Sequence, residues 1–419
     1  MRGKLISAFF MCAVGLLIIG VAVSHKKDTE EKKQETQISS EQKKDESIKI
    51  WYAYKGYEDY ILSAIEEYKK QNSVDYSIEL EYISEPGYFD YINEKSLEDE
   101  GPDIFLMGSE YLEKAYLLGL LEENFKDDIF NGEIYGQAAI TASTYNNKLY
   151  AYPLGFDVSA ILENQDYVSE EINTFEDIKR YADNFNGGAD EDEGNEKYAN
   201  VKGILAWDVN TLLFNYGFIG NKISFVKDGK KNIDINNTEV INAAKNYLLL
   251  KDYFSLTGES DYEEVKTSFA KGEIVFILAA TDVVNMLETA DINYSVRGML
   301  KLTDEIQCRS LSYTDLLAVN PRSSNKDVAT GLAEFISYEY AANMYAKCGI
   351  ISARKDITYD NEHINEFISI YDTSITMPKL LETEDYCIIM EEALKAVWNG
   401  ESVETIFDEL QTKYSERIK

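Results

Sequence analysis

Hydrophobic and polar positions alternate in blocks along the chain. Short apolar runs typical of strands, at residues 48–54, 78–83 and 102–109, are each followed by a segment with helical spacing. In the first of these segments, residues 59–71, apolar side chains recur at intervals of three and four residues. This strand–helix alternation predicts an α/β protein whose mostly parallel sheet carries helices on both faces.

The same pattern continues through a second region that begins near Phe156. Residues 148–164 predict two short strands broken near Leu154 and Gly155, and residues 202–208 predict another strand. Residues 211–221 predict a buried helix, and 316–324 predict a strand that returns to the first sheet. From residue 325 the pattern is helical to the end. At 419 residues, 45% of them hydrophobic, the chain is long enough for two domains.

The chain begins with two basic residues and an uncharged apolar run at 5–24, long enough to cross a bilayer. Basic residues before such a run keep that end inside, which predicts that the remainder is exported. Small residues at Ala22 and Ser24 resemble a cleavage site, so residues 1–24 are a signal peptide or a membrane anchor; the unbroken length favours the anchor. A lipid anchor at Cys12 is the weaker interpretation. Residues 25–47 are nearly free of apolar side chains and predict a disordered charged tether.

The charge balance excludes one large class of partners. Lys and Arg total 41 against 75 Asp and Glu, a net charge of −34, and this field repels a phosphate backbone. Nucleic acid is therefore excluded. The acidic loop at 187–198 lacks the spacing of an EF-hand calcium loop, so we favour a solvated turn over a calcium site.

The remaining cysteines, Cys308, Cys348 and Cys387, are widely spaced and form no CxxC pair. Buried thiols are the favoured interpretation, and one disulfide with a spare thiol stays open. The chain also has no P-loop, no GxSxG elbow and no HExxH pair, and it contains only 2 histidines. These features predict a protein that is not an enzyme and needs no cofactor or metal.

Several segments, in order, resemble the extracellular solute-binding proteins of ABC importers, specifically the maltose-binding-like sugar family. The resemblance is carried by "EGPDIFLMGSEYLEKAYLLGLLEE" at 100–123, "LYAYPLGFDVSAILENQD" at 149–166 and "SFAKGEIVFILAATD" at 268–282. Further matches are "NTFEDIKRYADNF", "LLAVNPRSSNKDVATGLAEFIS" and "ALKAVWNGESVETIFDEL". They cover nearly all of the exported chain.

The resemblance implies a periplasmic-binding-protein-like fold, in which two α/β lobes are joined by hinge crossovers and close on a ligand. It divides the chain into lobe 1, residues 48–155 plus 317–360, and lobe 2, residues 156–316 plus 361–419. It also implies a small-molecule ligand, a carbohydrate and specifically an oligosaccharide, and delivery to ABC permease subunits at the membrane by a monomer. The ligand cleft would lie at the carboxyl ends of the strands, as in other open α/β sheets.

Sugar recognition needs aromatic faces for stacking and carboxylates for hydrogen bonds. The loops that the resemblance places at the cleft carry both kinds of side chain, which gives as predicted ligand contacts Trp51, Tyr54, Lys55, Tyr57, Glu110, Tyr152, Asp157, Trp207, Asp208, Asp282, Tyr313 and Asp315. For Trp51, burial under the first helix is as good an interpretation as stacking. Asp157 is the strongest candidate, since it follows the first crossover.

Two departures from the family's pattern leave the sugar undefined. The aromatic residue expected after the strand at 268–278 is replaced by Ala279, Ala280, Thr281 and Asp282, and no glycine pair precedes Tyr313. The alternatives are a polyamine, peptide or other cargo in the same fold, or a surface sensor without a permease. A glycoside hydrolase with paired carboxylates is the enzyme alternative.

Overall fold

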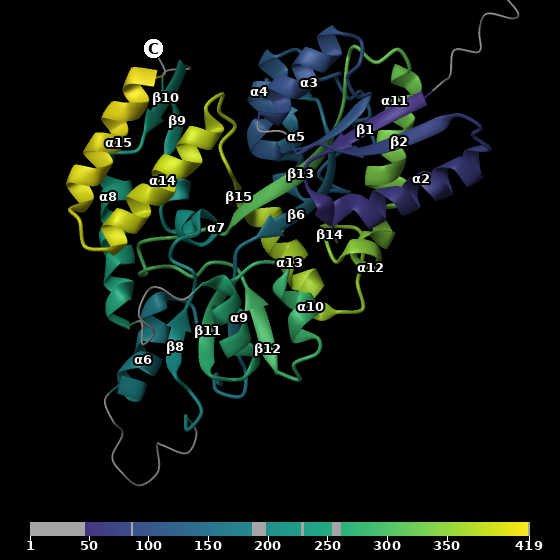
Figure 1. Ribbon diagram of the computed structural model, residues 1–419. Helices are drawn as coiled ribbons and strands as arrows, with labels where there is room; N and C mark the ends of the chain where they lie inside the picture. Colours follow the sequence, from purple (N-terminus) through teal and green to yellow (C-terminus); the bar gives the residue numbers. More distant parts are fainter. Residues whose placement is uncertain (1–46, 85–86, 187–197, 228–229, 254–260, 418–419) are drawn as a thin grey trace, which may run out of the picture. The chain divides into compact units, whose positions relative to one another are not determined.

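The computed structural model describes residues 47–84, 87–186, 198–227, 230–253 and 261–417 (Figure 1). The predicted N-terminal segment, residues 1–24, and nearly all of the predicted tether lie outside this part. So does the acidic loop, apart from Tyr198. None of the helices formed by the described residues is long and apolar enough to cross a membrane.

The first sheet collects strands from three distant parts of the chain. Its order is β14-β6-β13-β3-β1-β2, with β15 also paired to β13. The bounds are β1 (Ser47–Tyr52), β2 (Ser77–Tyr82), β3 (Ile104–Gly108), β6 (Tyr152–Val158), β13 (Leu311–Val319), β14 (Ile351–Ser352) and β15 (Ile375–Thr376). Strands β1 and β3 are parallel, whereas β13 runs antiparallel to both β3 and β6. The expectation of a mostly parallel sheet is therefore corrected to a mixed one, because β13 re-enters this sheet from the second.

The central strands of the first sheet are buried on both faces, as continuous apolar strands require, whereas the edge strand β2 is largely exposed. On β3, Ile104 and Leu106 belong to a core on one face, and Phe105 and Met107 to a core on the other. The first core includes side chains of α2 (Glu58–Asn72), α11 (Lys326–Glu334) and α5 (Gln137–Ser143). The second includes side chains of α3 (Tyr88–Leu97) and α4 (Leu112–Leu117).

The second sheet has the order β12-β7-β11-β8. Its strands are β7 (Ala160–Asn164), β8 (Gly203–Ala206), β11 (Ile274–Ala279) and β12 (Tyr294–Arg297). Its main helices are α6 (Phe175–Asn186), α8 (Thr238–Leu249), α9 (Tyr262–Ala270) and α10 (Val283–Leu287). The helix predicted over 211–221 is a short α7 (Leu212–Asn215) followed by two 3-10 turns.

The chain passes between the two sheets at Ser159, which separates β6 from β7, and again between β12 and β13. The predicted break near Leu154 is thus wrong by a few residues, since β6 continues without interruption to Val158. The lobe boundaries after residues 155, 316 and 360 stay a prediction.

The C-terminal part contributes to both regions. Helix α13 (Glu362–Thr373) packs against α5, β6 and β12. Helices α14 (Thr383–Trp398) and α15 (Val403–Arg417) then pack beside α8, and α15 also contacts the second strand of the hairpin β9 (Ser224–Lys227)–β10 (Lys230–Asp234), as Figure 1 shows. The short strands β14 and β15 interrupt the helical pattern that the sequence predicts for this part.

Two smaller elements and the cysteines complete the fold. Helix α12 (Met344–Cys348) contacts α2, and the small hairpin β4 (Thr144–Tyr145)–β5 (Lys148–Leu149) follows α5. Cys308, Cys348 and Cys387 are all free thiols; Cys308 is buried, as the sequence suggested, whereas Cys348 and Cys387 are only partly buried.

Candidate functional site

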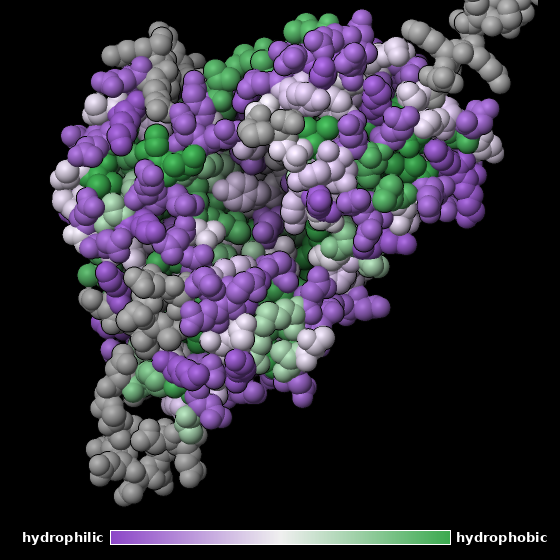
Figure 2. Space-filling view, viewed as in Figure 1, coloured by the Kyte–Doolittle hydropathy of each residue, from purple (hydrophilic) through white to green (hydrophobic). Residues whose placement is uncertain are grey.

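A cavity of about 280 Å³ lies where β1 and β3 end. It extends from the first sheet to the beginning of α14, which belongs to the C-terminal part of the chain. The surface is hollowed in this region, between α14 and α4, with many hydrophilic residues around the hollow (Figure 2). The cavity is lined by Ala53, Tyr54, Gly87, Tyr88, Phe89, Leu106, Met107, Gly108, Tyr111, Asp315 and Glu384.

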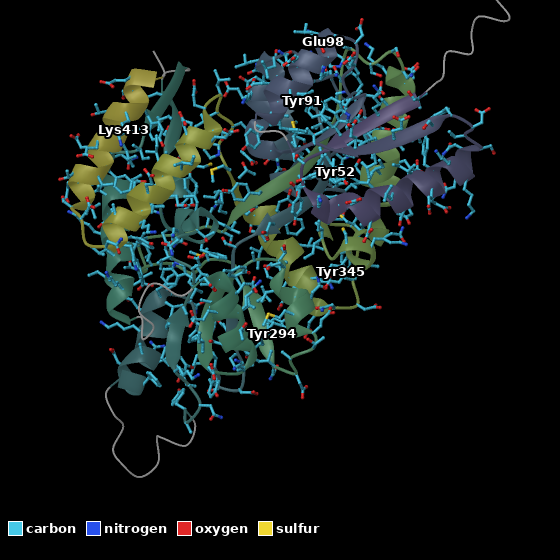
Figure 3. The ribbon with its side chains drawn as sticks, in the orientation of Figure 1. Tyr52, Tyr91, Glu98, Tyr294, Tyr345 and Lys413 are labelled. Atoms are coloured by element: carbon cyan, nitrogen blue, oxygen red, sulfur yellow. The ribbon has the colours of Figure 1, made fainter. Side chains whose placement is uncertain are left out.

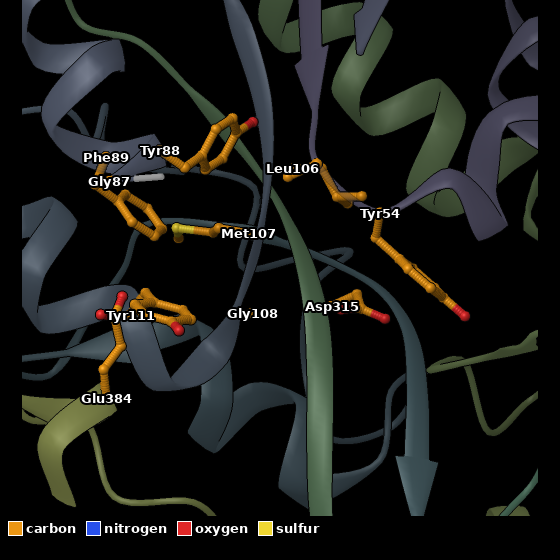
Figure 4. Close-up of a pocket in the computed structure, with 11 residues that line it drawn as sticks. Tyr54, Gly87, Tyr88, Phe89, Leu106, Met107, Gly108, Tyr111, Asp315 and Glu384 are labelled. Carbon is orange, nitrogen blue, oxygen red and sulfur yellow. The ribbon is translucent and has the colours of Figure 1, made fainter. Parts of the chain in front are cut away.

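Aromatic rings form two walls of this cavity. Phe89 and Tyr111 stack on each other, with ring centroids 4.9 Å apart and an interplanar angle of 29°. They lie with Met107 on one side of Asp315, and Tyr54 lies on the other (Figure 4). Tyr54 is 58% exposed, which is unusual for a tyrosine at the end of a core strand. Phe89 is buried, so the accessible aromatic surface is that of Tyr54 on one side and of the partly buried Tyr111 on the other. Aromatic surface on both sides of a carboxylate favours a ligand with a flat apolar side and polar edges.

Asp315 is the carboxylate at the centre of the cavity. Its Oδ2 accepts a hydrogen bond of 2.7 Å from the hydroxyl of the buried Tyr57. The pairing of β13 with β6 shifts register between Thr314 and Leu316, and such a bulge re-aims the displaced side chain. Burial raises the pKa of Asp315 to about 6; the Tyr57 hydrogen bond lowers it and the charge of Asp157 raises it.

Asp157 connects the two sheets near Asp315, although it does not line the cavity. Its Oδ1 accepts hydrogen bonds from the backbone N–H and the hydroxyl of Thr281, at 3.0 and 2.8 Å. Asp157 belongs to β6 and Thr281 follows β11, so this contact crosses between the sheets. Burial raises the pKa of Asp157, and the Thr281 hydrogen bonds partly offset that effect. Tyr313 is the register partner of Asp157 on β13 and is partly buried.

Glu110 lies directly behind the cavity lining. Its carboxylate oxygens are 2.5 and 2.6 Å from the position that a Cβ on Gly108 would take, so a side chain at position 108 would displace this carboxylate. Its Oε2 is buried and has no hydrogen-bond partner among the described residues. Burial raises the pKa of Glu110 to about 7, and the charge of Asp315 adds to this. A buried oxygen without a partner is costly and indicates a missing donor.

Asp282 follows Thr281 and is already neutralised. It accepts hydrogen bonds of 2.7 Å from the hydroxyl of Tyr262 and from Nζ of Lys266. Burial alone would lower the pKa of Lys266, but its hydrogen bonds to Asp282 and Glu263 raise it. Asp282 therefore adjoins the site as one half of an ion pair.

Two of the predicted aromatic contacts are core residues. Trp51 is 4% exposed and its ring is covered by Tyr91 of α3, at 5.4 Å; Figure 3 shows Tyr91 beside the first sheet. Trp207 is 1% exposed, and its indole N–H donates to Asn215 at 2.8 Å. Their predicted role as ligand contacts is not supported, because neighbouring side chains cover both ring systems.

Three other candidates have different partners. Tyr152 is buried at the far end of β6, where its ring contacts Phe130. Lys55 is turned over the ring of Tyr82, with Nζ 4.6 Å from the centroid. Asp208 accepts hydrogen bonds from Asn210 and Thr211 and so stabilises the turn before α7. These contacts account for all three residues without a ligand.

Four side chains of the lining are absent from the ligand contacts predicted from the sequence: Tyr88, Phe89, Tyr111 and Glu384. The only signal for the first two is their position directly after the Pro-Gly pair at 86–87 of the sequence, at the start of α3. The carboxylate of Glu384 lies next to Tyr111, whose pKa is raised by burial and by the charges of Glu110 and Glu384 (Figure 4). Glu384 reaches the cavity from a distant part of the chain, and no local pattern indicates this approach.

Two α/β sheets, joined by crossovers and carrying a cavity with groups from both the first sheet and a C-terminal helix, define a ligand receptor of the two-lobed class. The chain belongs to the bacterial extracellular solute-binding protein family, whose model matches residues 63–366.

Two curated relatives are similar over part of the chain. A galactooligosaccharide-binding protein of Bacillus subtilis is 25% identical over 257 residues, which cover 57% of this chain and 57% of the relative. A maltotriose-binding protein of Pyrococcus abyssi is 22% identical over 321 residues, or 74% of this chain and 66% of the relative. The chain thus spans less than two thirds of the length of these relatives.

Solved structures show the fold over a larger share. An extracellular solute-binding protein from Staphylococcus aureus in complex with maltose superimposes with a TM-score of 0.74 at 19% identity. The match covers 89% of this chain and 97% of the other. The predicted two-lobed fold is confirmed.

Proposed function

We propose that the protein is an extracytoplasmic receptor that binds a carbohydrate, specifically an oligosaccharide, between its lobes and delivers it to an ABC permease. The observation that carries this proposal is the cavity in which Tyr54 and Tyr111, the latter backed by Phe89, lie on either side of Asp315. Aromatic faces match the C–H side of a sugar ring, and carboxylate oxygens accept from its hydroxyls. The ligands in the names of the two relatives are oligosaccharides, which supports the same class here.

The test is a thermal-shift screen of the purified protein against neutral trisaccharides, spermidine and short peptides. A ligand at 100 times its dissociation constant stabilises a protein by roughly 2.7 kcal/mol, so a true ligand raises the melting temperature measurably. We expect maltotriose or β-1,4-galactotriose to raise it. A shift with spermidine or peptides and none with any sugar would contradict the proposal.

We further propose that the cleft binds its ligand without turnover. One oxygen of Asp157 is held by Thr281 and Asp282 is paired with Lys266, which suits fixed recognition better than proton transfer. Incubation with the bound trisaccharide, followed by chromatography, should return it intact. Appearance of shorter sugars at a rate that depends on Asp157 or Asp315 would favour the hydrolase alternative.

The exported location and the N-terminal anchor are also part of the proposal. The family consists of extracellular proteins, and the apolar run at 5–24 supplies a signal peptide or an anchor. Fractionation of cells that produce the full chain should recover it with membranes if the run is retained, and free of them if the run is cleaved. Recovery in the cytoplasm would contradict export.

A further inference from the structure

Carboxylate oxygens without hydrogen-bond partners gather around the cavity. Oδ1 of Asp315, Oδ2 of Asp157 and Oε2 of Glu110 have no such partner among the described residues. Asp315 lines the cavity, and Glu110 lies against the lining residue Gly108. Asp157 is close enough for its charge to raise the pKa of Asp315, and Glu384 adds a fourth acid on the opposite side of the lining. A ligand that satisfies these atoms has to bring donors, since an ionised carboxylate can only accept.

Two basic side chains near the cavity are already used by other groups. Lys266 is held by Asp282 and Glu263, and both Nζ–oxygen distances are 2.7 Å. Lys55 follows Tyr54 in the chain but is turned away over the ring of Tyr82. Neither side chain is therefore available to the acids of the cavity.

A third base lies beside the aromatic wall. Nζ of Lys114 is 5.8 Å from the ring centroid of Phe89, and it faces Asp90 at 3.9 Å. The cavity lining formed by the described residues contains no lysine or arginine. Within that lining, the negative charge of Asp315 and Glu384 is therefore not compensated by a basic side chain.

We propose that the site selects its sugar by charge: it accepts sugars whose polar groups donate, binds an amine-bearing sugar more tightly than the neutral form, and rejects sugars that carry a carboxylate, sulfate or phosphate. This inference rests on the proposed carbohydrate function. An ammonium group brings donors and a positive charge to Asp315 and Asp157, whereas an anionic group brings further acceptors to oxygens that lack donors. Like charges within a partly buried cavity also repel strongly, because water screens them poorly there.

The position of Glu110 means that the selection by charge arises at the cavity itself and not from the net charge of the whole protein. Its buried carboxylate lies against Gly108, which lines the cavity, so any charged group of a ligand that reaches Gly108 comes close to this acid. A general negative surface does not have this property, since exposed charges are screened by salt over about 10 Å at 0.1 M. Selection by charge should therefore persist at high ionic strength.

The experiment compares matched ligands by isothermal titration calorimetry with the full protein at pH 7.5, in 0.05 and in 0.5 M salt. Maltotriose and β-1,4-galactotriose are each used unmodified, with a terminal C6 hydroxyl oxidised to a carboxylate, and with that hydroxyl replaced by an amine. We expect the carboxylate form to bind about tenfold or more weakly than the neutral form, and the amine form to bind more tightly, in at least one series.

The outcomes distinguish a failure of charge selection from a failure of the proposed carbohydrate function. If, in every series whose neutral parent binds, the carboxylate form binds as tightly as that parent, charge selection is overturned and the carbohydrate function is left intact. Absence of binding by all six ligands to a folded protein overturns both.

Two variants and one control test whether the discrimination between charged sugars arises from the acids at the cavity. Asp315→Asn and Glu110→Gln should each reduce the discrimination between the carboxylate and amine forms several-fold. Asp75→Asn removes the same charge from an exposed turn between α2 and β2, at the opposite end of the sheet, and should leave the discrimination unchanged. Equal reduction by all three variants would mean that the whole-protein field is responsible, and would overturn the proposal.

Discussion

At the scale of single residues, the site consists of acids that the fold holds at a cost. Asp315 has one modest donor, Tyr57, and burial shifts its pKa to about 6. Glu110 is shifted to about 7 for the same reason. A binding site that keeps charged acceptors without donors sacrifices stability in the free protein for affinity in the complex.

Replacing Asp315 by Asn should stabilise the free protein at neutral pH. The folded-state pKa of about 6 lies above the ordinary value of 3.8, so folding disfavours the ionised carboxylate. The free energy of unfolding of the parent protein therefore falls as the pH rises from about 4 to 6. The asparagine side chain carries no charge, so the variant should gain about 1–2 kcal/mol at pH 7.5 and almost nothing at pH 4. Denaturant unfolding at both pH values measures this. A gain of equal size at the two pH values would contradict the argument, and Asp75→Asn is the control.

Alanine variants at Tyr54 and Trp207 should have opposite effects: the first weakens sugar binding, and the second lowers the stability of the fold. Tyr54→Ala removes a largely exposed ring from the cavity and should weaken sugar binding by about tenfold with little change in unfolding free energy. Trp207→Ala removes a buried ring and its hydrogen bond to Asn215, so it should cost about 3–5 kcal/mol while the folded fraction keeps its affinity. Calorimetric titration and denaturant melts of both variants test this, and the reverse assignment would contradict it.

The sequence predicts some of these residues and misplaces others for a physical reason. Asp157 and Asp315 stand out because a carboxylate in an apolar strand is expensive unless it has a role. Trp207 is misplaced because a tryptophan after a strand gives the same pattern whether it faces a cleft or a core. Glu384 cannot be predicted, because its approach to Tyr111 depends on how α14 folds back.

At the scale of elements, two irregularities of the strands build the site. The interruption at Ser159 ends β6 directly after Asp157 and Val158 and sends the chain into the second sheet. The register shift between Thr314 and Leu316 lies opposite Leu154 and Gly155, just beyond the pairing of Tyr313 with Asp157. Continuous apolar runs predict the strands β1, β3 and β11, but a run of hydrophobic residues contains no information about pairing direction. The antiparallel entry of β13 is therefore beyond what the pattern can predict.

Thr281→Val should test the contact between β6 and the loop after β11. Valine has the shape of threonine but loses the hydroxyl that donates to Asp157 at 2.8 Å, and the backbone N–H bond stays. Because Asp157 then lacks one of its positioning bonds, we expect several-fold weaker sugar binding and a loss of about 1 kcal/mol in stability. Thr281→Ser keeps the hydroxyl and should bind like the parent. Equal affinity of the Val variant and the parent would show that this contact does not position Asp157.

At the scale of the whole molecule, the lobes are connected by few segments, so their relative movement is expected. We propose an open–closed equilibrium in which a sugar that contacts both lobes shifts the population toward the closed form. Solution X-ray scattering should then show a smaller radius of gyration when β-1,4-galactotriose or maltotriose is bound. An unchanged radius at saturating ligand would contradict closure.

The whole-molecule account depends on the cavity between Tyr54 and Tyr111 being the ligand site. The most direct measurement is a crystal structure of the protein with the trisaccharide that binds most tightly. We predict a sugar ring between these two aromatic residues, with hydroxyls bonded to Asp315 and Asp157 and with contacts from both lobes. A trisaccharide bound elsewhere on the protein, with this cavity filled only by water, would contradict the account.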